Sequence, residues 1–262
     1  MPWSSRRSQA AVDFNGKLWV LGGAGNQYYN DVWSSPDGIN WSLDVANAPW
    51  QRRSHHSVTV FGGRMWLMGG QSGQGISYYF QNDVWSSADG VNWTLELPAA
   101  PWAHRAGHTT VAFNNRLWLC GGAALGNMVN EVWSSADGVN WTLETASAAW
   151  GGRSMHCSVV YVGRLWVIGG AGVMERVWNA PRLNDVWSSV NGTDWVCEVQ
   201  SAPWTPRHAH ACVVFNERLF LLGGNAVDAN MNDVWSYGLH MRPKVLPDGK
   251  VHLPYEAALQ AK

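Results

Sequence analysis

The chain carries little charge. Only 14% of its 262 residues are charged, and the formal net charge is −1. A nucleic-acid-binding protein needs a basic face that neutralises phosphates, so this balance argues against that class of partner. No apolar run reaches the roughly 18 residues that cross a membrane, and the first residues lack the apolar core of a signal peptide. We therefore expect no nucleic-acid partner, no membrane insertion and an intracellular, cytoplasmic location.

The sequence also lacks the paired cysteines of common metal sites. No cysteine lies in a Cys-x-x-Cys pair, so a zinc site of the usual spacing is not expected. The cysteines fall in apolar, strand-like runs, where cysteine behaves as a small buried hydrophobic residue. They are Cys120, Cys157, Cys197 and Cys212. We expect no metal and no cofactor.

Catalytic motifs are missing as well. The sequence contains no Gly-x-Ser-x-Gly, no His-Glu-x-x-His and no glycine loop that would cradle a phosphate. Glu175 is the only glutamate in the long variable loops, and one carboxylate alone is a poor basis for catalysis. We expect a protein that is not an enzyme.

Tryptophan, by contrast, is abundant and regularly placed. Of the 19 tryptophans, 18 occupy four slots that recur along the chain, and only Trp178 stands outside them. The slots are a Pro-Trp or Ala-Trp pair, an apolar-Trp pair before Gly-Gly, an Asp/Glu-Val-Trp-Ser run, and a Trp after Asp-Gly or Asn-Gly. The Gly-Gly pairs begin at Gly22, Gly69, Gly121, Gly169 and Gly223. A period of about 50 residues indicates a stacked or circular array of repeats.

Each repeat unit reads as β-structure. Residues 57–70 are two short apolar, β-branched runs around a tight turn, which predicts a hairpin. Residues 82–96 predict a second hairpin that turns at Ala-Asp-Gly. Four strands in an up-and-down order form one propeller blade, whose two faces the repeated tryptophans would bury against its neighbours.

These motifs resemble the kelch-repeat β-propeller family. The shared pattern is Arg-x-x-His, an apolar strand, a turn, Lys/Arg-Leu-Trp, Gly-Gly, a variable loop and Asn-Asp/Glu-Val-Trp-Ser. The turn Ser-Ala-Asp-Gly-Val-Asn-Trp also resembles the Asp-box hairpin of sialidase-type propellers, which lies away from their active site. The resemblance implies an all-β, five-bladed kelch-type β-propeller with four-stranded antiparallel blades and a non-repeat C-terminal tail.

The boundaries follow from the repeat. We place the propeller at residues 1–239 and the tail at residues 240–262. The repeat units span about 3–49, 50–101, 102–149, 150–203 and 204–239. The fifth unit has no Asp-Gly-x-Asn-Trp segment, so its outer strand is missing unless the tail supplies it.

We predict that a tail strand completes blade five. The candidates are Lys244–Leu246 and Val251–Leu253, which flank a Leu-Pro-Asp-Gly-Lys turn signal. Residues 255–262 would form a short helix or dock on a partner. The alternative is that a partner chain in a larger assembly completes the blade.

An Arg-x-x-His motif opens the units, with Gln in place of His in the first. By the kelch resemblance, these residues surround one mouth of the central channel. The arginines are Arg6, Arg53, Arg105, Arg153 and Arg207. The partners at the fourth position are Gln9, His56, His108, His156 and His210.

Two interpretations of this ring are open. Converging arginines suit a carboxylate or phosphate, and converging histidines suit a transition metal. However, each unit also carries one acid in its Asn-Asp/Glu-Val-Trp run, at Asp31, Asp83, Glu131, Asp185 and Asp233. One acid per arginine favours structural ion pairs, and a five-fold ring is too wide for metal ligands near 2 Å. We predict a structural role and keep a sugar or anion site as the alternative.

Binding residues are expected where the repeats differ. The most variable segments are 24–29, 71–81, 123–129, 171–183 and 225–231, and by up-and-down topology they share a face with the channel mouth. Tyr, Trp and Arg dominate binding hot spots, and variable loops on a rigid scaffold are the usual place for recognition. The candidates are Tyr28, Tyr29, Tyr78, Tyr79, Phe80, Arg176, Trp178 and Arg182.

The function predicted from these patterns is a non-catalytic protein-interaction scaffold or complex subunit. Its partner would be a protein or peptide bound on the variable-loop face. The alternative is a sugar- or anion-binding propeller, similar to a lectin, a mutarotase or a sialidase, that uses the channel-mouth arginines.

Overall fold

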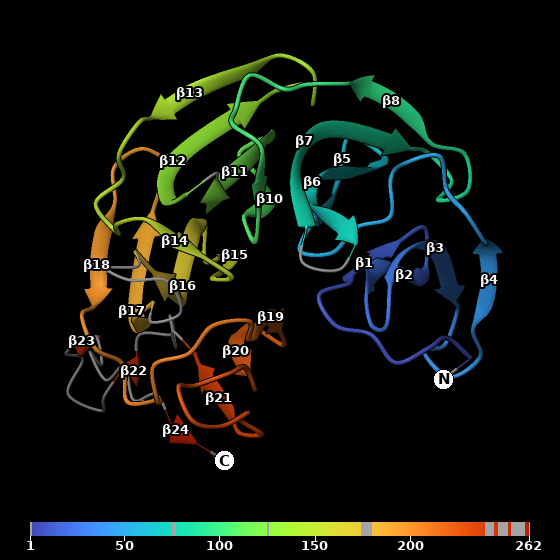
Figure 1. The fold of residues 1–262 in the computed structure, drawn as a ribbon. Coiled ribbons are helices and arrows are strands. Elements are labelled where there is room, and N and C mark those ends of the chain that lie inside the picture. The colour runs from blue at the N-terminus through green and yellow to red at the C-terminus, as the bar shows by residue number, and fades with distance from the viewer. Residues whose placement is uncertain are drawn as a thin grey trace.

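The protein is a series of antiparallel sheets arranged around a central space, as the computed structural model in Figure 1 shows. The structure describes residues 2–74, 77–124, 126–173, 180–238, 244–245, 251–252 and 260–261. Throughout this part of the chain the secondary structure is all β. It contains no helix with the length and apolar character needed to span a membrane.

The first two repeat units each form four strands in up-and-down order. The first contains β1 (Ala10–Phe14), β2 (Lys17–Ala24), β3 (Tyr28–Ser35) and β4 (Ser42–Val45). The second contains β5 (Ser57–Phe61), β6 (Arg64–Gln74), β7 (Ser77–Ser87) and β8 (Thr94–Leu97). Both hairpins predicted in the second unit are confirmed, because β5 pairs with β6 and β7 pairs with β8.

The third and fourth units add a short strand before the same four. The third contains β9 (Arg105–Ala106), β10 (Thr109–Phe113), β11 (Arg116–Ala124), β12 (Asn127–Ser135) and β13 (Trp141–Thr145). The fourth contains β14 (Arg153–Ser154), β15 (Cys157–Tyr161), β16 (Arg164–Gly172), β17 (Arg182–Ser189) and β18 (Val196–Val199). Because β9 pairs with both β11 and β7, the second and third units form one continuous sheet.

The fifth unit takes its fourth strand from the tail. It contains β19 (Ala211–Phe215), β20 (Arg218–Leu222) and β21 (Val234–Tyr237), and β24 (Gln260–Ala261) pairs with β21. The pieces predicted for this role were wrong, because β22 (Lys244–Val245) and β23 (Val251–His252) pair with each other. The Pro-Asp-Gly sequence between them favours a local hairpin. The helix predicted for 255–262 is wrong at Gln260–Ala261, and residues 253–259 lie outside the described residues.

The Gly-Gly pairs allow adjacent units to approach closely. Gly69 has φ +54°, and a Cβ there would lie 2.8 Å from the His108 ring of the next unit and 3.0 Å from the Arg105 carbonyl oxygen. Gly70 has φ +105°, and its Cβ would lie 2.7 Å from Cβ of His56 in its own unit. Both left-handed φ values disfavour side chains. The first glycine of the pair therefore allows the backbone of the next unit to approach closely. The second allows the same for the opening segment of its own unit.

The hydrophobic core lies between consecutive units. In the first seam, Phe14 and Trp19 pack with Trp50 and Met65 of the second unit, and all four are buried. Similar clusters occupy the three following seams. Trp50 also packs edge-on against Trp93, with ring centroids 6.1 Å apart. Burial of such large aromatic side chains is the main source of stability in each seam.

Gly70→Ala tests the close approach. The added Cβ would overlap His56 in a left-handed backbone, so we expect the free energy of unfolding to fall by about 3 kcal/mol or more. Gly63→Ala is the matched control, because Gly63 has φ +71° and no described residue would lie within 4 Å of its Cβ. Its cost is the backbone strain alone, about 1 kcal/mol. Urea unfolding measures both, and equal losses would contradict the close-approach account.

Candidate functional site

Each repeat-unit arginine is buried and held by several acceptors. In the second unit, Arg53 donates from Nη1 and Nη2 to the two carboxylate oxygens of Asp83, at 2.6 Å each. Nη1 also donates to the Gly69 carbonyl oxygen at 2.8 Å, and Nε donates to the Gln51 carbonyl oxygen at 2.9 Å. Four of the five guanidinium N–H groups are therefore used within the protein.

The same ion pair occurs in every unit. Nitrogen–oxygen distances run from 2.5 to 2.8 Å, and the arginine side chains are at most 2% exposed. The pairs are Arg6–Asp31, Arg53–Asp83, Arg105–Glu131, Arg153–Asp185 and Arg207–Asp233. In each unit the acid also accepts a bond from the indole N–H two residues later. The pairing of one acid per arginine predicted from the sequence is confirmed.

The arginine backbone joins this network to the preceding unit. The Arg53 N–H donates to the Tyr29 carbonyl oxygen at 3.0 Å, and the Gly23 N–H donates to the Arg53 carbonyl oxygen at 2.9 Å. The side chain of Arg53 thus bonds the second unit while its backbone bonds the first. Arg207 makes the same two kinds of contact, with its backbone bonded to Leu183 and Gly170 of the fourth unit. We call such an arginine a staple across a seam, and its guanidinium is not free to bind an anion.

Three of the paired acids, Asp31, Glu131 and Asp233, have lowered pKa values. Hydrogen bonds from Arg207 and then Trp235 lower the pKa of Asp233 to about 2, although partial burial opposes them. For Asp31, burial alone would raise the pKa, but bonds from Arg6 and Trp33 outweigh it, and the net shift is downward. A carboxyl group with a depressed pKa cannot serve as a general acid near neutral pH.

The histidines of the motif are buried against the preceding unit. His56, His108, His156 and His210 are each no more than 7% exposed, whereas Gln9 of the first unit is exposed. The Nε2 atom of His108 bonds the Ser57 hydroxyl at 3.0 Å, across the seam. Burial, and then the charge of Arg105, lowers the pKa of His108 to about 3. These imidazoles are neutral packing groups.

A row of left-handed residues was missed by sequence reasoning. The residue two positions after each arginine has a φ between +50° and +64°. Each N–H donates to the carbonyl oxygen of the corresponding residue one unit earlier, at 2.7 to 3.0 Å, from the second unit onward. The residues are Ser8, His55, Gly107, Met155 and Ala209. Only Gly107 carries a sequence signal for a positive φ, because the other side chains rarely adopt one.

The predicted loop-face residues differ in their exposure. Tyr79 is 63% exposed, and its backbone lies opposite Ser72 in the long β6–β7 hairpin. The Tyr28 hydroxyl, on the neighbouring loop, accepts a bond from Gln71 of that hairpin at 2.8 Å. The structure therefore brings the loops of the first and second units together.

The other candidates are partly covered or not described. The Arg6 guanidinium lies 4.2 Å from the Tyr29 ring centroid, and Phe80 is half-buried. Arg182 donates to the Ala180 carbonyl oxygen at 2.8 Å. The side chain of Tyr78 and all of Arg176 and Trp178 lie outside the described residues.

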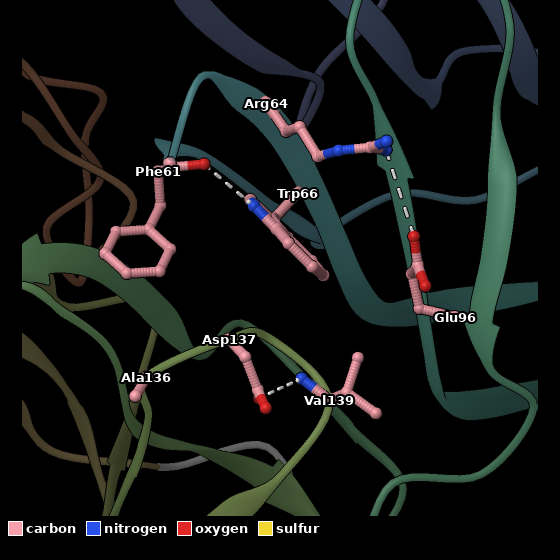
Figure 2. A pocket seen from close by; sticks show the side chains of 8 residues that line it. Phe61, Arg64, Trp66, Glu96, Ala136, Asp137 and Val139 are labelled. Atoms are coloured by element: carbon pink, nitrogen blue, oxygen red, sulfur yellow. Dashed lines mark hydrogen bonds and ion pairs between the residues drawn. The ribbon is translucent and has the colours of Figure 1, made fainter.

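A shallow pocket lies between the second and third units, at the turns opposite the variable loops (Figure 2). It measures about 390 Å³ and is lined by Phe61, Gly62, Arg64, Trp66, Glu96, Ala136, Asp137 and Val139. Asp137 accepts bonds from the N–H groups of Asn140 and Val139 at 2.7 and 2.9 Å. These bonds, led by that of Asn140, lower its pKa to about 2. Like the Asp-box turn it resembles, this turn is a structural hairpin.

Arg105→Met tests the staple. Removal of the guanidinium leaves the Glu131 carboxylate partly buried without its counter-ion, which costs about 3 to 5 kcal/mol of the free energy of unfolding. Arg116→Met is the control, because Arg116 forms a more exposed pair with Glu144 at 3.5 Å. We expect it to lose less than about 1 kcal/mol. The staple account fails if urea unfolding at pH 7 gives similar small losses for both.

His108→Gln tests the buried imidazole. The folded protein keeps His108 neutral down to about pH 3, whereas the unfolded chain takes up a proton below about pH 6.5. Stability from this group is therefore complete above pH 6.5 and falls as the pH drops toward 3. The slope is about 1.4 kcal/mol per pH unit. Urea unfolding between pH 7.5 and 5 measures this dependence. The free energy of unfolding of the Gln variant should fall less steeply with decreasing pH than that of the wild type, and equal slopes would contradict the assignment.

Comparisons with known proteins agree on the architecture. The DUF6242 beta propeller domain matches residues 35–155. The solved structure of YjhT superimposes with a TM-score of 0.75 at 18% identity, over 96% of this chain and 84% of that chain. Among curated proteins, none matches this sequence. The all-β repeats, the domain match and the structural match together show that this chain is a β-propeller.

Proposed function

We propose that the chain is a kelch-type propeller of five repeat units that acts as a non-catalytic protein-interaction scaffold or complex subunit. Its partner is a protein or peptide that binds the variable-loop face. The observation that carries the proposal is the commitment of all five channel-mouth arginines to buried ion pairs within the scaffold. Their chemistry is used for stability, so recognition falls to the residues that differ between units.

Catalysis has little support among the described residues. A hydrolase of sugars needs one carboxyl group held protonated near neutral pH. The carboxyl groups with shifted pKa values in the described part of the chain are all shifted downward. Their causes are structural bonds, as at Asp137, rather than a pair of acids that face a shared cavity.

The variable-loop face offers the exposed aromatic surface that a protein partner requires. Tyr79 is the most exposed aromatic residue among the loop candidates whose side chains the structure describes, and its strand is held by the long β6–β7 hairpin. Tyr28 from the first unit bonds the same hairpin. Rigid, exposed tyrosines provide contact area at low entropic cost, which is why they dominate hot spots.

The sugar- or anion-binding alternative depended on the channel-mouth arginines. Because Arg53 uses four of its five donors internally, an anion would have to displace Asp83 from a bidentate pair. That exchange would leave a carboxylate partly buried and unpaired, at a cost of several kcal/mol. The alternative is kept as an outcome of the test below.

Tyr79→Ala tests the proposal. The immobilised protein is used to capture partners from its own source cells, with quantification by mass spectrometry, and the same protein is applied to a glycan array. We expect the alanine variant to lose a captured protein at least about tenfold, because hot-spot truncations cost 2 kcal/mol or more. Its Tm should not change, since the side chain is exposed.

Two controls make the result specific. Tyr79→Phe keeps the ring and should retain most of the capture, and Leu95→Ala alters an exposed apolar side chain on β8, at the outer edge of the sheet. Protein capture that is equal for all variants would overturn the loop-face assignment. Glycan binding that survives Tyr79→Ala and is abolished by Arg53→Met would favour the sugar-binding alternative.

A further inference from the structure

Each seam between consecutive units joins two different faces. In the seam between the third and fourth units, the third contributes Phe113, Trp118 and Val132, which we call the forward face. The fourth contributes Trp150 and Leu165, which we call the rear face. The corresponding residues meet in the same way in the other three seams. A forward face is therefore complementary to a rear face.

The forward face of the fifth unit is uncovered. Phe215 occupies the position of Phe113 but is 63% exposed, whereas Phe113 is 5% exposed. Val234 occupies the position of Val132 and is 37% exposed, whereas Val132 is fully buried. Phe220 and Leu222, on β20, are only partly buried. The apolar pattern of a seam is present in this unit, and no neighbouring unit in the described part of the chain buries it.

The rear face of the first unit is uncovered in the same way. Leu18 is 45% exposed, whereas Met65, Leu117 and Leu165 at the same position are fully buried. Trp3 is partly exposed, whereas Trp50 at the same position is 1% exposed. Leu18 and Trp3 thus form half of a seam that lacks its forward-face partner.

The glycine in the turn before the outer strand also shows that the rear face of the first unit is uncovered. Gly90, Gly138 and Gly192 each lie against the tryptophan of the preceding unit, so closely that a Cβ would come within 2.4 Å of the ring. Gly38 of the first unit is in the same turn position. Among the described residues, its only neighbour within 4 Å of a Cβ is Leu18 of its own unit.

The two uncovered faces lie at the two ends of the array. Figure 1 shows β19–β21 at one end and β1–β3 at the other, with no described strand between them. The chain of backbone bonds through the left-handed residues runs from Ser8 to Ala209. Among the described residues it does not continue from Ala209 back to Ser8. The innermost layer is therefore an arc rather than a closed ring.

We propose that these two faces together form a docking site for one further unit of the same repeat, presented by a partner polypeptide. The occupant must offer a rear face to Phe215 and a forward face to Leu18 at once. Only a β-unit with the two unlike faces of this repeat meets both demands. The site is separate from the variable-loop face, so either proposal can fail without the other.

The length of the YjhT chain outside the structural match is close to that of one repeat unit. Gly-Gly pairs recur every 47 to 54 residues in this chain. If the aligned stretches are equally long, the 16% of the YjhT chain that this chain does not cover is about 48 residues. The tail after Tyr237 has about half that length. A second copy of this chain would bring its own free faces at opposite ends, so head-to-tail contacts would give a larger ring or a filament, depending on the rotation between copies.

Matched alanine substitutions measure whether Phe215 is covered. Phe113→Ala should lower the Tm of the full chain by about 10 °C, because it removes a buried ring from a seam. Phe215→Ala should lower it by less than about 2 °C, since the ring is exposed. A loss as large as that of Phe113→Ala would show that the ring closes on itself, and would overturn the proposal.

A chimaera tests whether a repeat unit fits the site. Residues 88–149 carry an outer strand followed by a complete unit, and they would replace residues 238–262 after Tyr237. We expect the chimaera to remain monomeric and to melt at a higher temperature. Within it Phe215→Ala should now cost about 10 °C, as Phe113→Ala does. A cost that stays below about 2 °C would mean that the unit does not enter the gap.

A third experiment supplies the further repeat unit as a separate polypeptide. Co-expression of residues 88–149 as a separate chain with the full protein should give a one-to-one complex that Phe215→Glu disrupts and Val139→Glu does not. If the full protein is instead an oligomer that Phe215→Glu dissociates, the occupant is a second copy. If deletion of residues 239–262 lowers the Tm and abolishes the effect of Phe215→Ala, the occupant is the tail. Either result overturns the proposal.

Discussion

The absence of side chains at the Gly-Gly pairs is the constraint on which the rest of the structure depends. Backbone and histidine atoms of neighbouring segments lie so close to Gly69 and Gly70 that an added Cβ would overlap them. The corresponding approach occurs at Gly22, where an added Cβ would lie 3.0 Å from the Arg53 carbonyl oxygen. It lets the Arg53 backbone bond the first unit while its side chain reaches Asp83 in the second. The tryptophans then pack in the seams between units.

The staple uses two of the charged residues that recur in each unit, the arginine and its acid. Each guanidinium links its own acid, a glycine carbonyl and a flanking carbonyl, and each acid also holds an indole N–H. Charged groups that satisfy one another inside a seam specify how two units fit together. They leave the arginines of this motif without a free charge for a ligand, and functional variation is left to the loops and to the exposed faces at the ends.

Much of this organisation was predictable from the sequence because it is repeated. The period, the hairpins and one acid per arginine are properties of each unit, and five copies make them visible. The left-handed residues were not predictable, because Met155 and Ala209 adopt a positive φ only under the constraint of neighbouring units. The tail strand was misplaced because the Pro-Asp-Gly turn pairs β22 with β23 locally.

The exposure of Phe215 could not be predicted at all. Its unit carries the same apolar pattern as the others. This pattern indicates which side chains a neighbouring unit could bury, but not whether that neighbour is present. The same holds for Leu18, which the sequence places in line with buried residues of the other units. In a repeat protein each unit contacts only its neighbours, so the burial of a side chain depends on the adjacent unit as well as on the sequence of its own unit.

Native-state hydrogen exchange resolved by residue tests most directly whether the seams are the unit of stability. Backbone amides open with free energies that reflect the local packing of each element. We predict the highest protection in β10–β11, whose unit has a seam on both sides, and the lowest in β1–β2 and β19–β20, whose units have a seam on one side only. Equal protection in β19–β20 and β10–β11 would contradict the account.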